Sequence, residues 1–352
     1  MPEDGRARTT LSIGQSWRKI RFPPCRSMST PRMLEDGMPE RYSSRRVRWT
    51  IEKRPLGAHM SIAGGVDRAI ERGASIGCSA IQIFNKSSNQ WAARPLGEDE
   101  VARFRAARAR AGIDPVVAHD SYLINLCSPD DALYRKSIAA LVEELERCAR
   151  LGVEWLVVHP GGHMGQGEDF GVRRMAGAID EVHVRLPACG TGIVIETMAG
   201  QGTVIGHRFE QIAAILANVK RPERLGVCLD TCHVFAAGYD LRTPQLYAET
   251  MRRFDGEIGF SRLRVVHVND SKKDLGCRVD RHEHVGKGFL GPEAFGLLMN
   301  DARFLNVPLL LETPKDETTC KEDVQNLTML IGLVDSGARR SKPRAAATGR
   351  DA

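Results

Sequence analysis

Short apolar runs that recur along the chain, each ending at or just before a polar residue, constrain the fold more than any other feature of the sequence. Eight such runs occur, at residues 56–60 (LGAHM), 80–84 (AIQIF), 115–119 (PVVAH), 155–159 (WLVVH), 192–196 (GIVIE), 226–230 (GVCLD), 263–268 (LRVVHV) and 308–312 (PLLLE). Runs rich in Val, Ile and Leu are typical of parallel strands that are buried on both faces. A helical pattern follows each run, and successive runs begin about 25 to 45 residues apart, which fits βαβ units. Eight strands and eight helices over about 280 residues predict an α/β fold, a (β/α)8 TIM barrel.

The charge distribution separates this barrel from two tails. Residues 1–55 hold 13 Lys and Arg against 6 Asp and Glu, and residues 338–352 hold 5 against 1. Residues 56–337 hold 32 against 37, so the net charge of +6 comes from the ends of the chain. We therefore expect a single barrel domain at 56–337, between disordered basic tails at 1–55 and 338–352.

The role of the N-terminal tail stays open. Its basic residues would attract nucleic acid or another polyanion. It can equally be a dispensable extension, or a start codon assigned too early, with Met28, Met33 and Met38 as other starts.

Cysteine and hydropathy patterns exclude several classes of protein. The nine cysteines are scattered and form no CxxC pair, so neither a disulfide scaffold nor a zinc-thiolate site is expected. No run approaches the roughly 18 apolar residues of a membrane span, and the N-terminus lacks the apolar segment of a secretory signal. We expect a soluble, cytoplasmic protein with no membrane partner, whose thiols are mostly reduced and buried.

The polar residues at the ends of the eight runs give the first indication of function. They are His59, Asn85, His119, His159, Glu196, Asp230, His267 and Glu312. In a barrel the carboxyl ends of the strands meet at one mouth, where the catalytic groups of this fold lie. Ionised carboxylates gathered in a concave site are costly without a cation, so the ring predicts a metal site.

Two further segments add ligands to this ring. His233 follows Asp230 by three residues, so both face the mouth if the chain turns into a helix there. Asp280 and His282 point the same way if their segment is extended. About nine imidazole and carboxylate ligands suit two or three zinc ions, with manganese or iron as the nearest competitors. Such a cluster favours displacement at phosphorus, because paired ions stabilise the entering and leaving oxygens.

Seven motifs resemble those of a known family. AHDSYLINL (118–126), VVHPGGH (157–163), VIETMAGQG (194–202), CLDTCHVFAAGYD (228–240), VHVNDSK (266–272), RVDRHEHVGKG (278–288) and LLLET (309–313) match, in order and spacing, the endonuclease IV family of DNA-repair apurinic/apyrimidinic (AP) endonucleases. The resemblance covers about residues 56–335. It implies a trinuclear zinc barrel that hydrolyses the phosphodiester 5′ to an abasic site in base excision repair, leaving a 3′-hydroxyl and a 5′-deoxyribose phosphate, and that also removes 3′ blocking groups. It further implies double-stranded DNA as the partner and a monomeric enzyme.

The resemblance also implies a role for each residue of the ring. The first zinc would be held by His119, His159 and Glu196, the second by Glu196, Asp230, His267 and Glu312, and the third by His233, Asp280 and His282. Glu196 would then be the catalytic bridging carboxylate, and a zinc-bound hydroxide the nucleophile. Manganese or iron can replace zinc at one position. His59 and His163 are expected to support ligands without binding metal themselves.

DNA contacts follow from the same resemblance. The abasic sugar must rotate out of the DNA helix, and protein side chains must fill the space that it leaves in the base stack. The family inserts loops after the early strands, which correspond here to residues 85–91 and 121–125. The expected DNA-binding residues are Asn89, Gln90, Tyr122 and Leu123. Asn89 stands where the best-known family pattern has Arg, so the resemblance does not predict how this position contacts the DNA backbone.

Two other functions stay open. A sugar isomerase or epimerase on a related metal-dependent barrel would use a set like Glu196, Asp230, His267 and Glu312, but has little use for the five further ligands. A non-catalytic nucleic-acid-binding protein asks for Lys and Arg at the rim instead of carboxylates. The number of ions bound per chain and the cleavage of abasic DNA separate the three hypotheses.

Overall fold

Eight parallel strands close into a barrel. The computed structural model describes residues 54–334. The barrel strands are β1 (Leu56–Met60), β2 (Ala80–Phe84), β3 (Val116–His119), β4 (Trp155–Val158), β5 (Gly192–Glu196), β6 (Leu225–Asp230), β7 (Leu263–His267) and β10 (Leu309–Leu311). They pair in the order β1-β10-β7-β6-β5-β4-β3-β2, and β1 pairs with both β10 and β2. The predicted TIM barrel is confirmed, with one strand in each predicted run.

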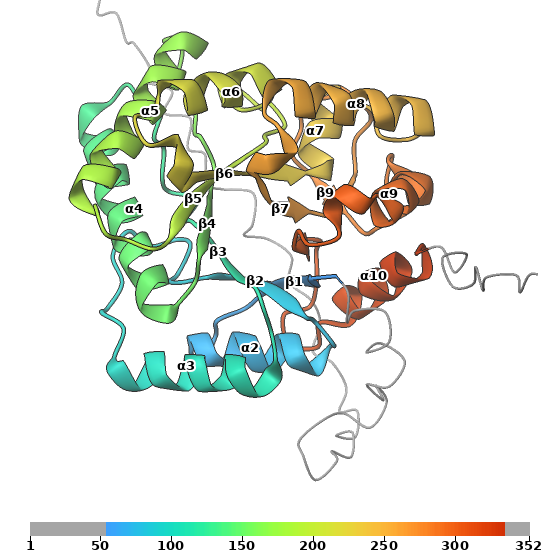
Figure 1. Cartoon of the computed structure of the whole chain (residues 1–352), viewed down its shortest axis with the longest axis horizontal. Helices are drawn as coiled ribbons and strands as arrows, with labels where there is room; N and C mark the ends of the chain where they lie inside the picture. The colour runs from blue at the N-terminus through green and yellow to red at the C-terminus, as the bar shows by residue number, and fades with distance from the viewer. Residues whose placement is uncertain (1–53, 335–352) are drawn as a thin grey trace, which may run out of the picture. The chain divides into compact units, whose positions relative to one another are not determined.

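Helices surround the strands in chain order, from α2 and α3 below the barrel through α4 and α5 to α9 and α10 (Figure 1). The helices are α2 (Val66–Ser75), α3 (Glu98–Ala111), α4 (Asp131–Leu151), α5 (Glu168–Arg185), α6 (Phe209–Asn218), α7 (Thr231–Ala237), α8 (Pro244–Glu257), α9 (Gly291–Asn300) and α10 (Lys321–Gly332). In the described part of the chain, three single 3-10 turns precede strands or loops: η1 (Pro222–Arg224), η2 (Phe260–Arg262) and η3 (Ala302–Phe304). A separate two-stranded sheet pairs β8 (Asp270–Ser271) with β9 (His282–Glu283). None of the helices within 54–334 has the length and apolar character needed to cross a membrane.

The helix α4 shows how the sequence fixes these elements. Asp130 precedes it, and the side chain accepts hydrogen bonds from the backbone N–H groups of Ala132 and Leu133. Such a cap satisfies donors that have no partner within the helix. The helix ends at Leu151, and the left-handed φ of 75° at Gly152, the next residue, suits a residue without a Cβ. Between these signals an apolar face packs on the barrel, with Leu141 fully buried.

The barrel interior is a small apolar layer separate from the larger core between strands and helices. Its members are Ala80, Val117, Val157, Val194, Cys228, Val265 and Leu310. Side chains alternate along a strand, so the residue two positions further on faces the same interior, one layer nearer the mouth. Those residues are Gln82, His119, His159, Glu196, Asp230, His267 and Glu312. The apolar pattern of the strands therefore places the polar ring.

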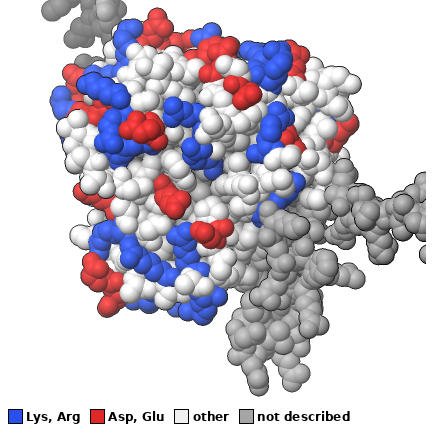
Figure 2. All heavy atoms as spheres, viewed as in Figure 1, with Lys and Arg blue, Asp and Glu red and all other residues white. Residues whose placement is uncertain are grey.

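Charges of both signs are interspersed on the face of the molecule shown in Figure 2. This mixture agrees with the near balance of basic and acidic residues over 56–337. The tails predicted at 1–55 and 338–352 fall outside the described residues, apart from Arg54 and Pro55, and stay predictions.

Candidate metal centre

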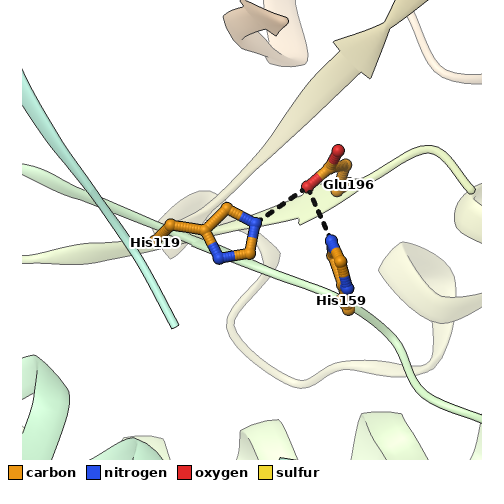
Figure 3. Close-up of side chains that lie close together, drawn as sticks. All are labelled: His119, His159 and Glu196. Carbon is orange, nitrogen blue, oxygen red and sulfur yellow. Dashed lines mark hydrogen bonds and ion pairs between the residues drawn. The ribbon is translucent and has the colours of Figure 1, made fainter. Parts of the chain in front are cut away.

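Glu196, the last residue of β5, lies at the centre of the polar cluster and is fully buried. Its Oε2 atom lies 3.2 Å from Nε2 of His119 and 3.2 Å from Nε2 of His159 (Figure 3). Its Oε1 atom lies 3.0 Å from Nδ1 of His267 and 3.2 Å from Nδ1 of His233. Oε2 of Glu196 therefore faces His119 and His159, and Oε1 faces His267 and His233.

A second group shares Glu196 and adds one side chain from each of three neighbouring strands. Asp230 ends β6, His267 ends β7, and Glu312 directly follows β10. One ligand atom from each of the four residues lies within 4.8 Å of the others. Nδ1 of His267 is 3.2 Å from Oε2 of Glu312 and 3.8 Å from Oδ2 of Asp230. These distances leave room for a cation at the centre of the group.

The third group depends on two short elements, α7 and β9. Oδ1 of Asp230 accepts a hydrogen bond of 2.8 Å from the backbone N–H of His233, which caps α7 directly after β6. β9 pairs with β8 and holds His282 opposite Ser271. Nε2 of His233 and Nε2 of His282 lie 3.2 Å and 3.4 Å from Oδ1 of Asp280. The helix after Asp230 and the extended segment at His282 meet the two conditions under which the sequence analysis expected these side chains to face the mouth.

The structure thus brings all nine predicted ligands together, in three groups that share Glu196 or lie beside it. The groups are His119, His159 and Glu196; Glu196, Asp230, His267 and Glu312; and His233, Asp280 and His282. Their binding of metal stays a prediction.

In four of the five histidines of these groups, one ring nitrogen lies within hydrogen-bond distance of a carbonyl oxygen of the protein. The contacts are His119 Nδ1 to Asp120 O (2.9 Å), His233 Nδ1 to Thr197 O (2.9 Å), His282 Nδ1 to Glu312 O (3.2 Å) and His267 Nε2 to Gln82 Oε1 (2.8 Å). A carbonyl oxygen accepts only, so the anchored nitrogen carries the proton and donates. In the neutral ring the other nitrogen then presents its lone pair to the cluster, which is the arrangement of metal-binding histidines.

Gln82 in β2 is the residue of this site that the sequence analysis missed. It is fully buried, accepts from His267, and donates a hydrogen bond of 2.5 Å to Oε1 of Glu312. The signal was the single polar residue inside the run AIQIF, two positions after Ala80 of the barrel interior.

Asn85, which the sequence analysis placed in the ring, lies elsewhere. Its Nδ2 donates to the carbonyl of Glu144 and contacts Sγ of Cys148, both on α4. The prediction was wrong because Asn85 follows the end of β2, where it turns towards the helical layer, and Gln82 takes the corresponding place at the mouth.

Electrostatics within the cluster favour a cation. Burial alone lowers the pKa of His119 and of His267, but the neighbouring carboxylates outweigh it and raise each pKa to about 9. Burial opposes ionisation of Glu196, yet the surrounding histidines hold its pKa well below the usual range. Without a metal the cluster therefore holds excess protons on imidazole, in the positions that a divalent cation would take.

Unsatisfied atoms point to the same conclusion. Nε2 of His233 and Nε2 of His282 are buried and have no hydrogen-bond partner within the described part of the chain. Both are close to Asp280, whose side chain is 39% exposed. Buried polar atoms are normally satisfied, so these residues fit a bound metal ion that takes both lone pairs.

Cys228 and Cys232, on either side of Asp230, lie close to the cluster, although the sequence predicts buried thiols that only pack. Sγ of Cys228 falls within 4.8 Å of ligand atoms of Glu196 and His267, and Cys232 lies similarly close to Asp230 and His282. Burial raises the pKa of the Cys228 thiol well above its usual value and that of Cys232 to about 12. Burial therefore disfavours the thiolate at both positions, which suits packing residues better than metal ligands.

Two loops border the cluster: loop A (residues 85–91) after β2 and loop B (residues 121–125) after β3. Asn89 and Gln90 of loop A lie at the surface, and Leu123 of loop B is partly buried. Tyr122 is 62% exposed, yet its ring centre lies 6.0 Å from that of His119 and 6.1 Å from that of His159. The exposed ring of Tyr122 therefore stands beside the first ligand group. The contact of both loops with DNA stays a prediction.

The two supporting histidines occupy different places. Nδ1 of His59 lies 3.0 Å from Nε2 of Gln82 and 3.7 Å from Oε1 of Glu312, next to the second group. His163 accepts a hydrogen bond from the backbone N–H of Gly167 and shapes the loop after β4. Their influence on metal binding stays a prediction.

Known proteins are similar to this chain in sequence and in fold. A family of xylose isomerase-like TIM barrels matches residues 70–330. Probable endonuclease 4 of Chloroflexus aurantiacus is 51% identical over 279 residues, which cover 79% of this chain and 98% of that protein. Probable endonuclease 4 of Geobacter sulfurreducens is 50% identical over 79% of this chain and 94% of that protein. The chain belongs to the endonuclease IV family.

Solved structures agree with this membership. Endonuclease IV from Thermus thermophilus superimposes with a TM-score of 0.71 at 37% identity, covering 79% of this chain and 98% of that protein. A D-tagatose 3-epimerase-like protein has a TM-score of 0.58 at only 17% identity, and so shares the fold alone. The predicted enzyme class, a hydrolase of the AP endonuclease (deoxyribonuclease IV) type, is confirmed by the endonuclease IV relatives.

Proposed function

We propose that this endonuclease IV family member hydrolyses the phosphodiester 5′ to an abasic site in double-stranded DNA, using three zinc ions. The products would be a 3′-hydroxyl and a 5′-deoxyribose phosphate, and the same site would remove blocking groups from 3′ ends. Manganese or iron would serve at one position in place of zinc. The observation that carries the proposal is the division of nine side chains into three groups, two of which share Glu196 while the third lies beside it.

The chemistry follows from this division. Divalent ions in such groups lower the pKa of water and offset the charge on the entering and leaving oxygens of a phosphodiester. Glu196 sets the spacing of the first two groups through its two oxygens. Asp230 links the second and third groups, because it belongs to one and caps the helix that holds His233 in the other.

One side of the cluster is open to a substrate. Glu196, Asp230 and His267 are fully buried. The partly exposed side chains are His159 (23%), Asp280 (39%), His282 (15%) and Glu312 (16%). A phosphodiester from solution would reach the cluster on this side, beside the exposed ring of Tyr122.

The sugar epimerase hypothesis explains less of the site. A set like Glu196, Asp230, His267 and Glu312 would suffice for it. It leaves His119, His159, His233, Asp280 and His282 without a role, although they supply most of the other two groups.

Cleavage of a labelled abasic duplex in a buffer free of magnesium and EDTA tests the proposal. The expected product is a strand cut 5′ to the lesion whose 3′ end a DNA polymerase extends, with an undamaged duplex left intact. Glu196→Gln should lower the rate by about 100-fold or more, because a neutral amide is a poor bridging ligand, while binding of abasic DNA largely survives. A wild-type protein with full zinc that leaves the abasic duplex uncut would refute the proposal.

A further inference from the structure

A buried ion pair joins loop A to α4, and neither residue belongs to the three metal groups. Nζ of Lys86 lies 3.4 Å from Oε1 of Glu144, and the two side chains are 2% and 1% exposed. Nζ of Lys86 also donates a hydrogen bond of 2.7 Å to the carbonyl of Trp91, at the far end of the same loop. Lys86 therefore closes loop A on itself while it ties the loop to the helix.

The same glutamate holds loop B. Oε1 of Glu144 accepts a hydrogen bond of 3.3 Å from the backbone N–H of Ser121, the first residue of that loop. The hydroxyl of Ser121 in turn donates a bond of 2.6 Å to the carbonyl of Ser88 in loop A. One carboxylate oxygen thus connects the two loops, which also contact each other directly.

Arg147, one turn further along α4, also holds loop A. Nε and one terminal nitrogen of Arg147 donate bonds of 3.0 Å and 2.7 Å to the carbonyl of Asn85, where loop A begins. The other terminal nitrogen donates to the carbonyl of Arg94, beyond the end of loop A. Nδ2 of Asn85 returns a bond of 2.9 Å to the carbonyl of Glu144. Both loops are therefore fixed by two neighbouring side chains of one helix.

We propose that Lys86 and Glu144 are positioning residues for DNA recognition, which hold Gln90 of loop A and Tyr122 and Leu123 of loop B at the spacing needed to enter a duplex together. This inference rests on the proposed function. Insertion into a duplex must offset the loss of base stacking at the lesion. Loops ordered before binding avoid a further entropic cost, so the pair acts on binding more than on the chemical step.

Three variants test the pair by steady-state kinetics on an abasic duplex: Lys86→Met, Glu144→Gln and the double variant Lys86→Met/Glu144→Met. Each single variant should raise KM about tenfold, the effect of ordering one or two further side chains on binding. The turnover number at saturation and the zinc content should stay within about twofold of wild type, because neither residue contacts the metal groups. A 2-aminopurine base beside the lesion should show a smaller fluorescence rise on binding, since it reports insertion directly.

The double variant separates positioning from stability. An apolar pair in place of a buried ion pair commonly restores the stability that a single variant loses. The melting temperature should therefore recover while KM stays high, because Ser121 has still lost its acceptor. Asp323→Asn is the matched control: Asp323 forms another buried ion pair, 2.7 Å from Lys315. It should lower the melting temperature and leave KM unchanged.

Two results would overturn the inference: single variants with the wild-type KM and 2-aminopurine signal, or a double variant whose KM recovers together with its stability. Arg147→Gln provides a further check that spares the buried pair, and it should raise KM without loss of zinc. Failure of the wild-type protein to cut abasic DNA would refute the proposed function instead, so the two failures are distinct.

Discussion

Oδ1 of Asp230 accepts the backbone N–H of His233 at 2.8 Å, and this one hydrogen bond places two potential ligands in neighbouring groups. Asp230 is the last residue of β6, and its side chain caps α7. The other carboxylate oxygen, Oδ2, faces the cluster and accepts a hydrogen bond of 2.7 Å from the side-chain amide of Asn269. An Asp-x-x-His sequence at a strand end therefore serves structure and site together.

Asp230→Asn and Asp230→Ala should separate these two roles. Both metal-free variants should be less stable than wild type, because the carboxylate that faces His267 and accepts from Asn269 is gone. Asn caps a helix about as well as Asp, so the Ala variant should be less stable than the Asn variant by about 1 kcal/mol. Both variants should bind fewer zinc ions, because an amide replaces or Ala removes an anionic ligand. Calorimetry and metal analysis measure the two effects, and full zinc content in the Asn variant would contradict the role of the charge.

Gln82→Met should weaken zinc binding without any change to a ligand. The variant removes the oxygen that accepts from Nε2 of His267, so the ring loses its fixed orientation. Loss of such a partner typically lowers metal affinity about 10- to 100-fold. Competition with a chelator measures the change, with Gln82→Glu as the variant that keeps an acceptor oxygen. Equal affinity in the Met variant and wild type would remove Gln82 from the site.

The metal-free protein should lose stability as the pH rises from about 6.5 to 9. The pKa values of His119 and His267 are raised to about 9, because nearby carboxylates outweigh burial. A raised pKa contributes stability that is complete below the unfolded value of about 6.5 and is lost through the folded value.

Zinc should reverse this trend, since binding displaces the protons and tightens at higher pH. Melting curves with and without zinc across this range measure both effects. A metal-free melting temperature that rises over the same range would contradict the protonated cluster.

Cys228→Ala and Cys232→Ala should each retain full zinc content. Burial raises the pKa of both thiols, and nine imidazole and carboxylate side chains already form the three groups without them. Cys228→Ala should still lower stability by about 1 kcal/mol, because it opens a cavity in the barrel interior. Metal analysis and thermal unfolding distinguish the two effects, and a missing zinc in either variant would show a thiolate ligand.

The sequence predicted the barrel because eight apolar runs are separated by helical patterns, and it predicted the grouping of ligands because the motifs resemble those of the endonuclease IV family. The ends of β5, β6 and β7 carry Glu196, Asp230 and His267, as expected. Asn85 and Gln82 were confused because an apolar run shows where a strand lies but not which residue of it faces the mouth. The link from Lys86 through Glu144 to loop B joins residues far apart in the chain, so no local pattern contains it.

Zinc titration of the metal-free protein, with the rate of abasic-duplex cleavage measured at each step, tests the three-group site most directly. The rate should stay near background until all three groups are filled, and reach its maximum at about three zinc ions per chain. A full rate at one bound ion would contradict the site that we propose.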